Sequence, residues 1–386
     1  MPPRCVRTRA GSDRPQRGRH PPPLRSGRPD VLGDRSVTLV TGATGFLGSA
    51  LVVSLVEQGE AVRCVVRGAT AASRAAKLRT ALDGRVAAKD QHRIEVVPGD
   101  LAEERLGLSA AGFAALGRDV SRVVHCGARV NMTLPYGPLY GTNVRATEEL
   151  IELAEACSAS FGYVSSLAAV GRSVTGEPFE LHDSVSGGYG QTKWSADRLV
   201  SVAHQEGRVR AVILRPGRIT AHSRTARSNP DDLLERVIRV SAWLGVVPVL
   251  DTRVRLSPVD WVSRLVVALF GTERAHGQAY HLIAAQSLLW ADVPAALRAA
   301  GYEPVELPYQ RWRSAVLAAG RDDPAVARLC HALPADRLSF DDRIGCEPRN
   351  AARTLAGEYP DLPPAAGLLG GTIAAWQRTG ELPSVP

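Results

Sequence analysis

The chain has 386 residues, of which 45% are hydrophobic and 22% charged, a composition typical of a globular protein with a sizeable core. No stretch approaches the roughly 20 uncharged apolar residues of a membrane span, so the sequence excludes an integral membrane protein. Its six cysteines are scattered without a Cys-x-x-Cys pair, which predicts neither a disulfide framework nor a metal site. Because unpaired thiols fit a reducing compartment, we expect a cytoplasmic protein.

The net charge of +8 is concentrated at the N-terminus. Residues 1–35 hold nine arginines and three aspartates, whereas the rest of the chain has a net charge of only +2. This segment has almost no apolar residues and cannot bury enough surface to fold, and it lacks the apolar run of a signal peptide. We interpret residues 1–35 as a disordered tail, with a functional basic arm as the alternative, and we expect no nucleic-acid partner.

From residue 37 onward, short apolar runs alternate with helical patterns. The expected strands are residues 37–40, 61–66, 94–97, 123–125, 161–164 and 211–214. Helical patterns follow Gly48, cover residues 144–157 and begin again near Tyr189. Strands that alternate with helices predict βαβ units, and continuous apolar strands indicate that both sheet faces are covered. The sequence therefore predicts an α/β fold, a Rossmann-type doubly wound parallel sheet.

The alternation ends near Ser223. Residues 226–258 and 286–386 are rich in alanine, proline and arginine and mostly helical in pattern, and only residues 279–283 resemble a further strand. We therefore expect two parts: a nucleotide-binding domain of residues 36–225, completed by about 259–285, and a smaller substrate-binding lobe formed by residues 226–258 and 286–386.

Three glycines, Gly42, Gly45 and Gly48, form a G-x-x-G-x-x-G loop between the first strand and the first helix. In such a loop the first glycine makes a tight turn, the second admits the pyrophosphate, and the third lets the helix pack closely. The phosphates then meet free N–H groups at the start of the helix. A strand before the loop and a helix after it are the context that predicts a dinucleotide site.

The end of the second strand indicates which dinucleotide binds. NAD-dependent enzymes usually place an acid there for the ribose diol, but this chain has Arg67. A guanidinium suits a 2′-phosphate, and Lys77 and Arg74 on the next helical pattern could reach the same group. We therefore expect NADPH, with a solvated strand-end charge as the alternative role of Arg67. Asp100 and Leu101, after the third strand, are placed to meet the adenine.

A second group of residues predicts proton-transfer chemistry. Tyr189 and Lys193 form a Y-x-x-x-K pair, which lies on one face of a helix. A nearby ammonium is expected to lower the pKa of the phenol, so that Tyr189 exchanges a proton near neutral pH. Ser166 ends the fifth strand, at the carboxyl edge of the sheet, where its hydroxyl can polarise a substrate carbonyl. These three residues are the predicted catalytic group.

The glycine loop, Ser166 and the Tyr189/Lys193 pair resemble an extended short-chain dehydrogenase/reductase. The finer match is to the thioester reductase branch, the terminal reductase domains of nonribosomal peptide synthetases and carboxylic acid reductases. Residues 188–194 look like its G-Y-x-Q-S/T-K-W motif, and residues 215–219 like its R-P-G-x-I. Residues 258–261 resemble P-V-D-Y/W, and residues 380–383 resemble G-x-L-P. Two departures are Ala226, in place of glycine, and Asp197, in place of glutamate.

The resemblance implies further site residues and a function. By resemblance, six residues would also line the cofactor: Thr44, Phe46, Leu47, Gly127, Lys193 and Pro216. The implied activity is NADPH-dependent reduction of a carrier-protein- or CoA-bound acyl or peptidyl thioester to an aldehyde, with further reduction to an alcohol left open, in secondary metabolite biosynthesis. The alternatives are a reductase of a nucleotide sugar or hydroxysteroid-like alcohol or ketone, and a redox-sensing binding protein on the same fold.

Residues 208–255 contain ten arginines, no lysine and four acids. Because carrier proteins are commonly acidic, we hypothesise that Arg224, Arg227, Arg236 and Arg239 flank a carrier-docking entrance; an ordinary solvated surface is the alternative. We expect no membrane partner. The oligomeric state stays open, with a monomer favoured.

Overall fold

The computed structural model describes residues 36–171, 174, 176–183, 185–340 and 348–383. The predicted tail, residues 1–35, lies outside the described residues. None of the helices within these ranges is long and apolar enough to cross a membrane.

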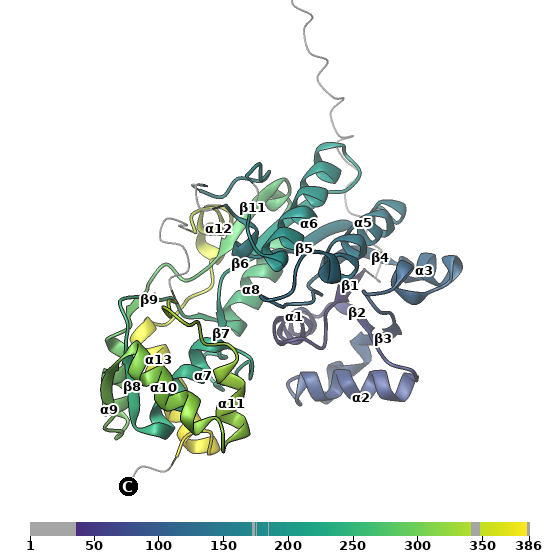
Figure 1. Cartoon of the computed structure of the whole chain (residues 1–386). Coiled ribbons are helices and arrows are strands. Elements are labelled where there is room, and N and C mark those ends of the chain that lie inside the picture. The colour runs from purple at the N-terminus through teal and green to yellow at the C-terminus, as the bar shows by residue number, and fades with distance from the viewer. Residues whose placement is uncertain (1–35, 172–173, 175, 184, 341–347, 384–386) are drawn as a thin grey trace, which may run out of the picture. The chain divides into compact units, whose positions relative to one another are not determined.

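A seven-stranded sheet forms the centre of the nucleotide-binding part (Figure 1), with the strand order β11-β6-β5-β4-β1-β2-β3. Its strands are β1 (Val37–Thr41), β2 (Ala61–Val66), β3 (Ile94–Pro98), β4 (Val120–His125), β5 (Ser160–Val164), β6 (Ala211–Pro216) and β11 (Gln278–Leu282). Every neighbouring pair is parallel. The order reverses between β1 and β4, as in doubly wound folds, so the predicted fold class is confirmed.

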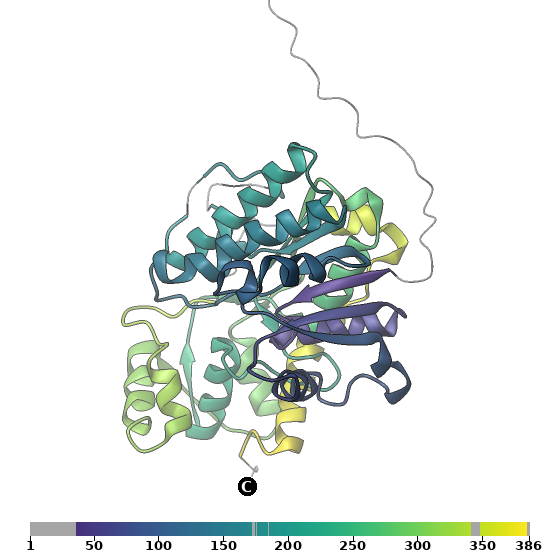
Figure 2. The ribbon, with the colours of Figure 1, turned by 90° about the vertical axis from the view of Figure 1, so that its right-hand side faces the viewer.

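Helices cover both faces of this sheet (Figures 1 and 2). One face carries α1 (Phe46–Glu57), α2 (Ala71–Leu82) and α8 (Val259–Phe270), and the other carries α3 (Ala110–Leu116), α5 (Ala146–Ala156) and α6 (Gly188–Gln205). Within β1, Val40 belongs to the hydrophobic cluster that includes residues of α1 and α8, on one face of the sheet. Leu39 belongs to the cluster that includes residues of α5 and α6, on the other face. Successive side chains of a strand point to opposite faces, so a strand covered on both sides is apolar throughout.

Short elements connect the strands. The 3-10 helices are Ala88–Arg93, Glu104–Gly107, Leu167–Ala169, Glu273–Ala275 and Ala356–Glu358. Helix α4 (Gly137–Tyr140) continues into a π-helical turn, Gly141–Arg145, before α5 begins. Strands β7 (Ile219–Thr220) and β10 (Ser257–Pro258) pair in parallel.

The C-terminal lobe has a hydrophobic cluster of its own, which includes Trp290, Trp312 and Trp376. Its helices are α7 (Leu233–Leu244), α9 (Asp292–Ala299), α10 (Tyr309–Ala319), α11 (Pro324–Cys330) and α13 (Ala365–Thr379). Two strand pairs add to the expected helices: β8 (Val246–Val249) with β13 (Val305–Pro308), and β9 (Arg253–Val254) with β12 (Leu288–Leu289). These pairs were not predicted, because strands of two to four residues leave no readable alternation.

Helix α12 (Asn350–Leu355) departs from the expected division of the chain. It was assigned to the lobe, yet Ala351 and Leu355 pack in the cluster with α1 and α8. The Asn350 Nδ2 also donates to the Ala279 carbonyl of β11 at 3.0 Å. The segment after residue 348 therefore returns to the central sheet before α13 completes the lobe.

Ala226, which stands in place of a glycine of the resembled family, adopts a backbone conformation that favours glycine. Its φ of +52° lies in the left-handed region, which strains a residue with a Cβ. The Ala226 N–H donates to the His222 carbonyl at 2.8 Å, and its side chain is buried. This turn leads into α7, which begins at the N-cap Asp232.

Candidate active site

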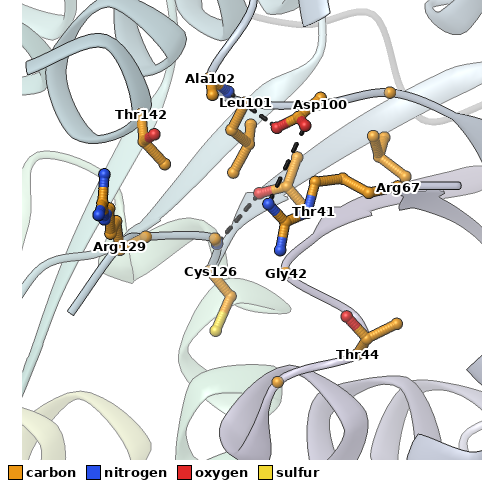
Figure 3. Close-up of a pocket in the computed structure, with 15 residues that line it drawn as sticks. Thr41, Gly42, Thr44, Arg67, Asp100, Leu101, Ala102, Cys126, Arg129 and Thr142 are labelled. Carbon is orange, nitrogen blue, oxygen red and sulfur yellow. Dashed lines mark hydrogen bonds and ion pairs between the residues drawn. The ribbon is translucent and has the colours of Figure 1, made fainter. Parts of the chain in front are cut away.

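A cavity of about 620 Å³ lies at the carboxyl ends of β1, β2, β3 and β4 (Figure 3). Its lining residues are Thr41, Gly42, Thr44, Gly45, Val65, Arg67, Gly99, Asp100, Leu101, Ala102, Cys126, Gly127, Ala128, Arg129 and Thr142. Seven of them were predicted from the sequence to bind the cofactor: Gly42, Thr44, Gly45, Arg67, Asp100, Leu101 and Gly127. The cavity is within the usual size range of a small-molecule or cofactor site.

The glycine loop has the geometry that a dinucleotide needs. Gly42 has a φ of +72°, and a Cβ there would lie 2.7 Å from the Gly127 Cα. A Cβ on Gly48 would overlap the Gly42 carbonyl, so this glycine lets α1 pack against the loop. Gly45 is the N-cap of α1 and makes no side-chain cap, which leaves the first N–H groups of the helix for an anion.

Six predicted cofactor residues lie outside the cavity lining: Phe46, Leu47, Gly48, Lys77, Lys193 and Pro216. The first three form the first turn of α1, so their backbone N–H groups are what they can offer a phosphate. Pro216 is the last residue of β6, and Lys193 lies within α6.

Arg67 is an exposed cation that lines the cavity directly after β2. Its side chain is 73% exposed, and its Nη1 lies 4.0 Å from the Asp100 Oδ2 (Figure 3). The expected helpers are used elsewhere: the Lys77 Nζ donates to the Arg67 carbonyl at 3.1 Å, and the Arg74 Nη1 donates to the Gly68 carbonyl at 2.7 Å. Neither lines the cavity, because each cation is bonded to the backbone of the loop that carries Arg67.

The structure brings Ser166 and Tyr189 together. Ser166 follows β5 and begins a 3-10 turn, where its Oγ accepts from the Ala168 N–H at 3.1 Å. Tyr189 is the second residue of α6, and its hydroxyl is hydrogen-bonded to Ser166. Burial raises the pKa of Tyr189 to about 12, and the Ser166 hydrogen bond opposes that rise. Tyr189 is therefore a protonated phenol, poised to donate.

Lys193 lies one turn along α6 from Tyr189 and is buried. Its Nζ donates to the Val164 carbonyl at 2.7 Å and to the Tyr163 hydroxyl at 3.4 Å. Burial lowers the pKa of Lys193 to about 8, against the opposing effects of Cys126 and Asp197. The expectation that this ammonium lowers the pKa of Tyr189 is wrong in this structure, because the ammonium bonds to β5 and burial dominates the phenol.

A buried ion pair stabilises the elements that carry these residues. Arg215 and Asp197 are fully buried, with Arg215 Nη2 2.8 Å from Asp197 Oδ1. The Ser165 hydroxyl donates to Asp197 Oδ2 at 2.7 Å, and the Arg215 guanidinium also donates to the Pro178 and Phe179 carbonyls. The pair thus ties together the strand end next to Ser166, the helix of Lys193 and strand β6.

Comparison with known proteins identifies the group to which this geometry belongs. Residues 40–266, more than half of the chain, match the family model described as male sterility protein. The chain belongs to this family. Isonitrile lipopeptide synthase of Streptomyces coeruleorubidus is 32% identical over 84% of this chain and 22% of that protein. L-2-aminoadipate reductase of Saccharomyces cerevisiae is 32% identical over 82% of this chain and 25% of that protein.

The chain thus spans a quarter or less of these curated relatives, but nearly all of one solved domain. The terminal R domain from the myxalamid PKS-NRPS biosynthetic pathway is 32% identical, with a TM-score of 0.84, over 92% of this chain and 94% of that one. The resemblance to terminal reductase domains of nonribosomal peptide synthetases is confirmed. The predictions that the protein is an oxidoreductase and that it uses a nicotinamide cofactor are confirmed as well.

Eight of the fifteen lining residues were not predicted from the sequence: Thr41, Val65, Gly99, Ala102, Cys126, Ala128, Arg129 and Thr142. Cys126 and Arg129 closely follow β4, so the rule that sites lie at carboxyl strand ends could have identified them. Thr142 lies in the π-helical turn, which has no sequence signature. The neighbouring His125 is a buried packing residue: burial lowers its pKa to about 3, and its ring bonds to Thr41 and Thr147.

The arginines of the expected docking entrance are mostly neutralised. Arg227 pairs with Asp83, Arg236 with Asp231 and Arg239 with Glu381, whereas Arg224 is exposed. Arg239 also stacks over Trp376, 5.0 Å from the ring centre. This face therefore carries less free positive charge than the number of its arginines indicates.

Proposed function

We propose that this member of the male sterility protein family is an NADPH-dependent reductase of acyl or peptidyl thioesters, borne by a carrier protein or CoA, in secondary metabolite biosynthesis. The observation that carries the proposal is the hydrogen-bonded pair of Ser166 and Tyr189, next to Lys193 and to the dinucleotide cavity. The myxalamid R domain, which this chain covers almost completely, supports a carrier-bound substrate. The free cysteines Cys64, Cys126, Cys157 and Cys330 support a cytoplasmic location.

The described residues fit a dinucleotide. Gly42, Gly45 and Gly127 line the cavity, and the uncapped start of α1 would face a pyrophosphate. Arg67 would hold the 2′-phosphate that distinguishes NADPH from NADH, and Lys193 would hold the nicotinamide ribose. When bound, the cofactor supplies a hydride to the substrate carbonyl carbon.

The chain's own residues then manage charge and protons. The Ser166 and Tyr189 hydroxyls donate hydrogen bonds to the carbonyl oxygen, where negative charge develops. Tyr189 passes its proton to that oxygen as general acid. The tetrahedral thiohemiacetal loses the thiol when its C–S bond breaks, which releases an aldehyde and the free thiol of the carrier.

The alternative, a reductase of a nucleotide sugar, shares only the fold. UDP-glucuronic acid 4-epimerase from Bacillus cereus has a TM-score of 0.62 at 18% identity. That structure holds NAD, whereas Arg67 of this chain suits a 2′-phosphate.

The deciding experiment measures NADPH oxidation with four substrates: acetyl-pantetheine, octanoyl-pantetheine, octanal and a UDP-sugar. The aldehyde product is trapped, and the released thiol is titrated. We expect thioester-dependent oxidation that yields one thiol for each aldehyde released. Oxidation with the UDP-sugar but with neither thioester would overturn the proposal.

A further inference from the structure

Residues 128–136 form a loop between β4 and α4, here called the rim loop. The loop starts two residues after Cys126, which lies close enough to Tyr189 and Lys193 to raise the pKa of both. It ends against the first residue of α6, because a Cβ on Gly188 would overlap the Leu134 carbonyl and the Tyr136 nitrogen. The loop therefore runs from the cavity lining, which includes Ala128 and Arg129, to the start of the helix that carries Tyr189.

The backbone of the rim loop is held in place at several points. The Arg129 N–H donates to the buried Asn143 Oδ1 at 2.7 Å, and the Asn143 Nδ2 donates to the Arg129 carbonyl at 3.1 Å. The Asn131 Oδ1 accepts from the backbone N–H groups of Thr133 and Leu134, both at 2.9 Å. At the far end, the Tyr136 hydroxyl donates to the Ser195 hydroxyl of α6 at 3.3 Å. The exposed side chains of this loop are thus presented from a fixed backbone.

Two of these side chains are large, apolar and open to solvent. Val130 is 68% exposed and Met132 is 71% exposed, the two highest values among the large exposed hydrophobic residues of the described ranges. An ordered loop beside a reaction centre that leaves such groups in water indicates a surface for an apolar ligand. Methionine suits this role because its flexible thioether adapts to different shapes.

We propose that Val130 and Met132 bind the acyl chain of the thioester, so that this reductase selects substrates with an apolar acyl group of several carbons. This inference rests on the proposed function. A thioester held at Ser166 and Tyr189 extends in two directions, the acyl chain and the pantetheine arm. The arm carries amides and hydroxyls that need hydrogen-bond partners, which valine and methionine do not offer. An alkyl chain needs only apolar area.

The size of the effect follows from the area buried. A methylene group of the acyl chain that moves from water into full apolar contact raises the affinity of the protein for that chain about fourfold. The gain is about twofold when half of the surface of the methylene stays exposed to solvent. Contact over the outer methylenes of an octanoyl chain therefore corresponds to roughly a tenfold preference over an acetyl group.

The test uses near-isosteric changes that remove apolarity and keep volume. The double variant Val130→Thr with Met132→Gln is compared with wild type and with Val249→Thr, a change at another exposed valine, 55% exposed in β8 of the lobe. The probes are acetyl-, butyryl- and octanoyl-pantetheine with NADPH, and kcat/KM is measured for each. Thermal unfolding of each variant checks that the fold is retained.

We expect the double variant to lose about tenfold in kcat/KM for octanoyl-pantetheine and no more than about twofold for the acetyl thioester. The Val249→Thr control should keep the wild-type dependence on chain length. Equal losses for all three thioesters, or none, would overturn the acyl-chain site while leaving the thioester reductase intact. If wild type reduces no thioester, the proposed function fails and this inference fails with it.

Discussion

Around the parallel sheet, Arg67, Asp100 and Ser166 of the candidate site follow the ends of strands, whereas in the C-terminal lobe several polar contacts join segments more than 40 residues apart. The Trp290 Nε1 donates to the Pro248 carbonyl, and the Tyr302 hydroxyl donates to the Pro383 carbonyl. Arg239 pairs with Glu381 across 142 residues. The residues of the candidate site thus depend mainly on the central sheet and the helices beside it, whereas the fold of the lobe depends on contacts between distant segments. Changes in the sheet should therefore alter turnover, and changes in the lobe should alter stability.

The largest expected effect tests the chemistry of the sheet edge. Tyr189→Phe should lower kcat about 10²- to 10⁴-fold, the usual contribution of a general acid. Binding of NADPH, measured by fluorescence titration, should stay within a few-fold. Tyr280→Phe removes another tyrosine hydroxyl, which bonds to Thr354 far along the chain, and should leave kcat unchanged. Wild-type turnover by Tyr189→Phe would remove Tyr189 from the mechanism.

The second effect separates Arg67 from the cations around it. Arg67→Asp should weaken NADPH binding about 100-fold, because a guanidinium–phosphate contact is lost and a like charge replaces it. Binding of NADH should change far less. Lys77→Met serves as the control, since the Lys77 ammonium bonds to the Arg67 backbone and lies outside the cavity lining. A preference of wild type for NADH in kcat/KM would contradict the assignment.

The third effect concerns the pH dependence of lobe stability. Burial raises the pKa of Glu235 to about 8, with a smaller contribution from Asp232, and Glu235 Oε1 accepts from the Ala221 N–H at 2.8 Å. The native state therefore keeps a proton that the unfolded chain loses near pH 4.5. The stabilisation is complete below that pH and is lost as the pH rises through about 8, by about 1.4 kcal/mol per unit.

Glu235→Gln should remove this slope. Urea unfolding at pH 5.5 and pH 7.5 should show the variant gaining roughly 2 to 3 kcal/mol relative to wild type between the two pH values. Glu148→Gln, at an exposed carboxyl of α5, should follow wild type at both. A parallel response of Glu235→Gln and wild type would show that Glu235 ionises in the native state as it does in the unfolded chain.

The smallest effect lies at the turn before α7. Ala226→Gly should stabilise the protein by about 1 kcal/mol, because glycine adopts the φ of +52° without strain. Ala242→Gly makes the same chemical change inside α7 and should destabilise by a similar amount. Thermal unfolding of both variants should therefore show shifts of opposite sign. Two shifts of the same sign would mean that packing, and not backbone strain, dominates at Ala226.

The contrast between the two regions also explains what the sequence could predict. Ser166, Tyr189 and the glycine loop were predictable because each has a fixed spacing from a strand or on a helix, and the backbone alone brings it to the sheet edge. The direction of a long side chain has no such signal. Lys77 donates to the Arg67 carbonyl, and Lys193 donates to the Val164 carbonyl of β5. Both directions depend on the packing around the side chain.

The lobe shows the same limit on a larger scale. Its helical character could be predicted, but the pairing of β8 with β13 joins two short runs that lie far apart in the chain, with helical segments between them. The return of α12 to the central sheet depends on Asn350 and on two buried apolar residues. A single sequence carries no local pattern for either contact.

The Arg215–Asp197 pair has a consequence for how this protein can evolve. Loss of one member leaves a buried charge unpaired, at a cost of roughly 3 to 5 kcal/mol, whereas replacing both with apolar residues is often neutral. A lineage that loses the charge at only one position passes through a poorly folded ancestor, and selection removes it before the second change arises. Positions 197 and 215 should consequently be inherited as a unit, and because Ser165 and α6 depend on that unit, the catalytic edge is shielded from gradual drift.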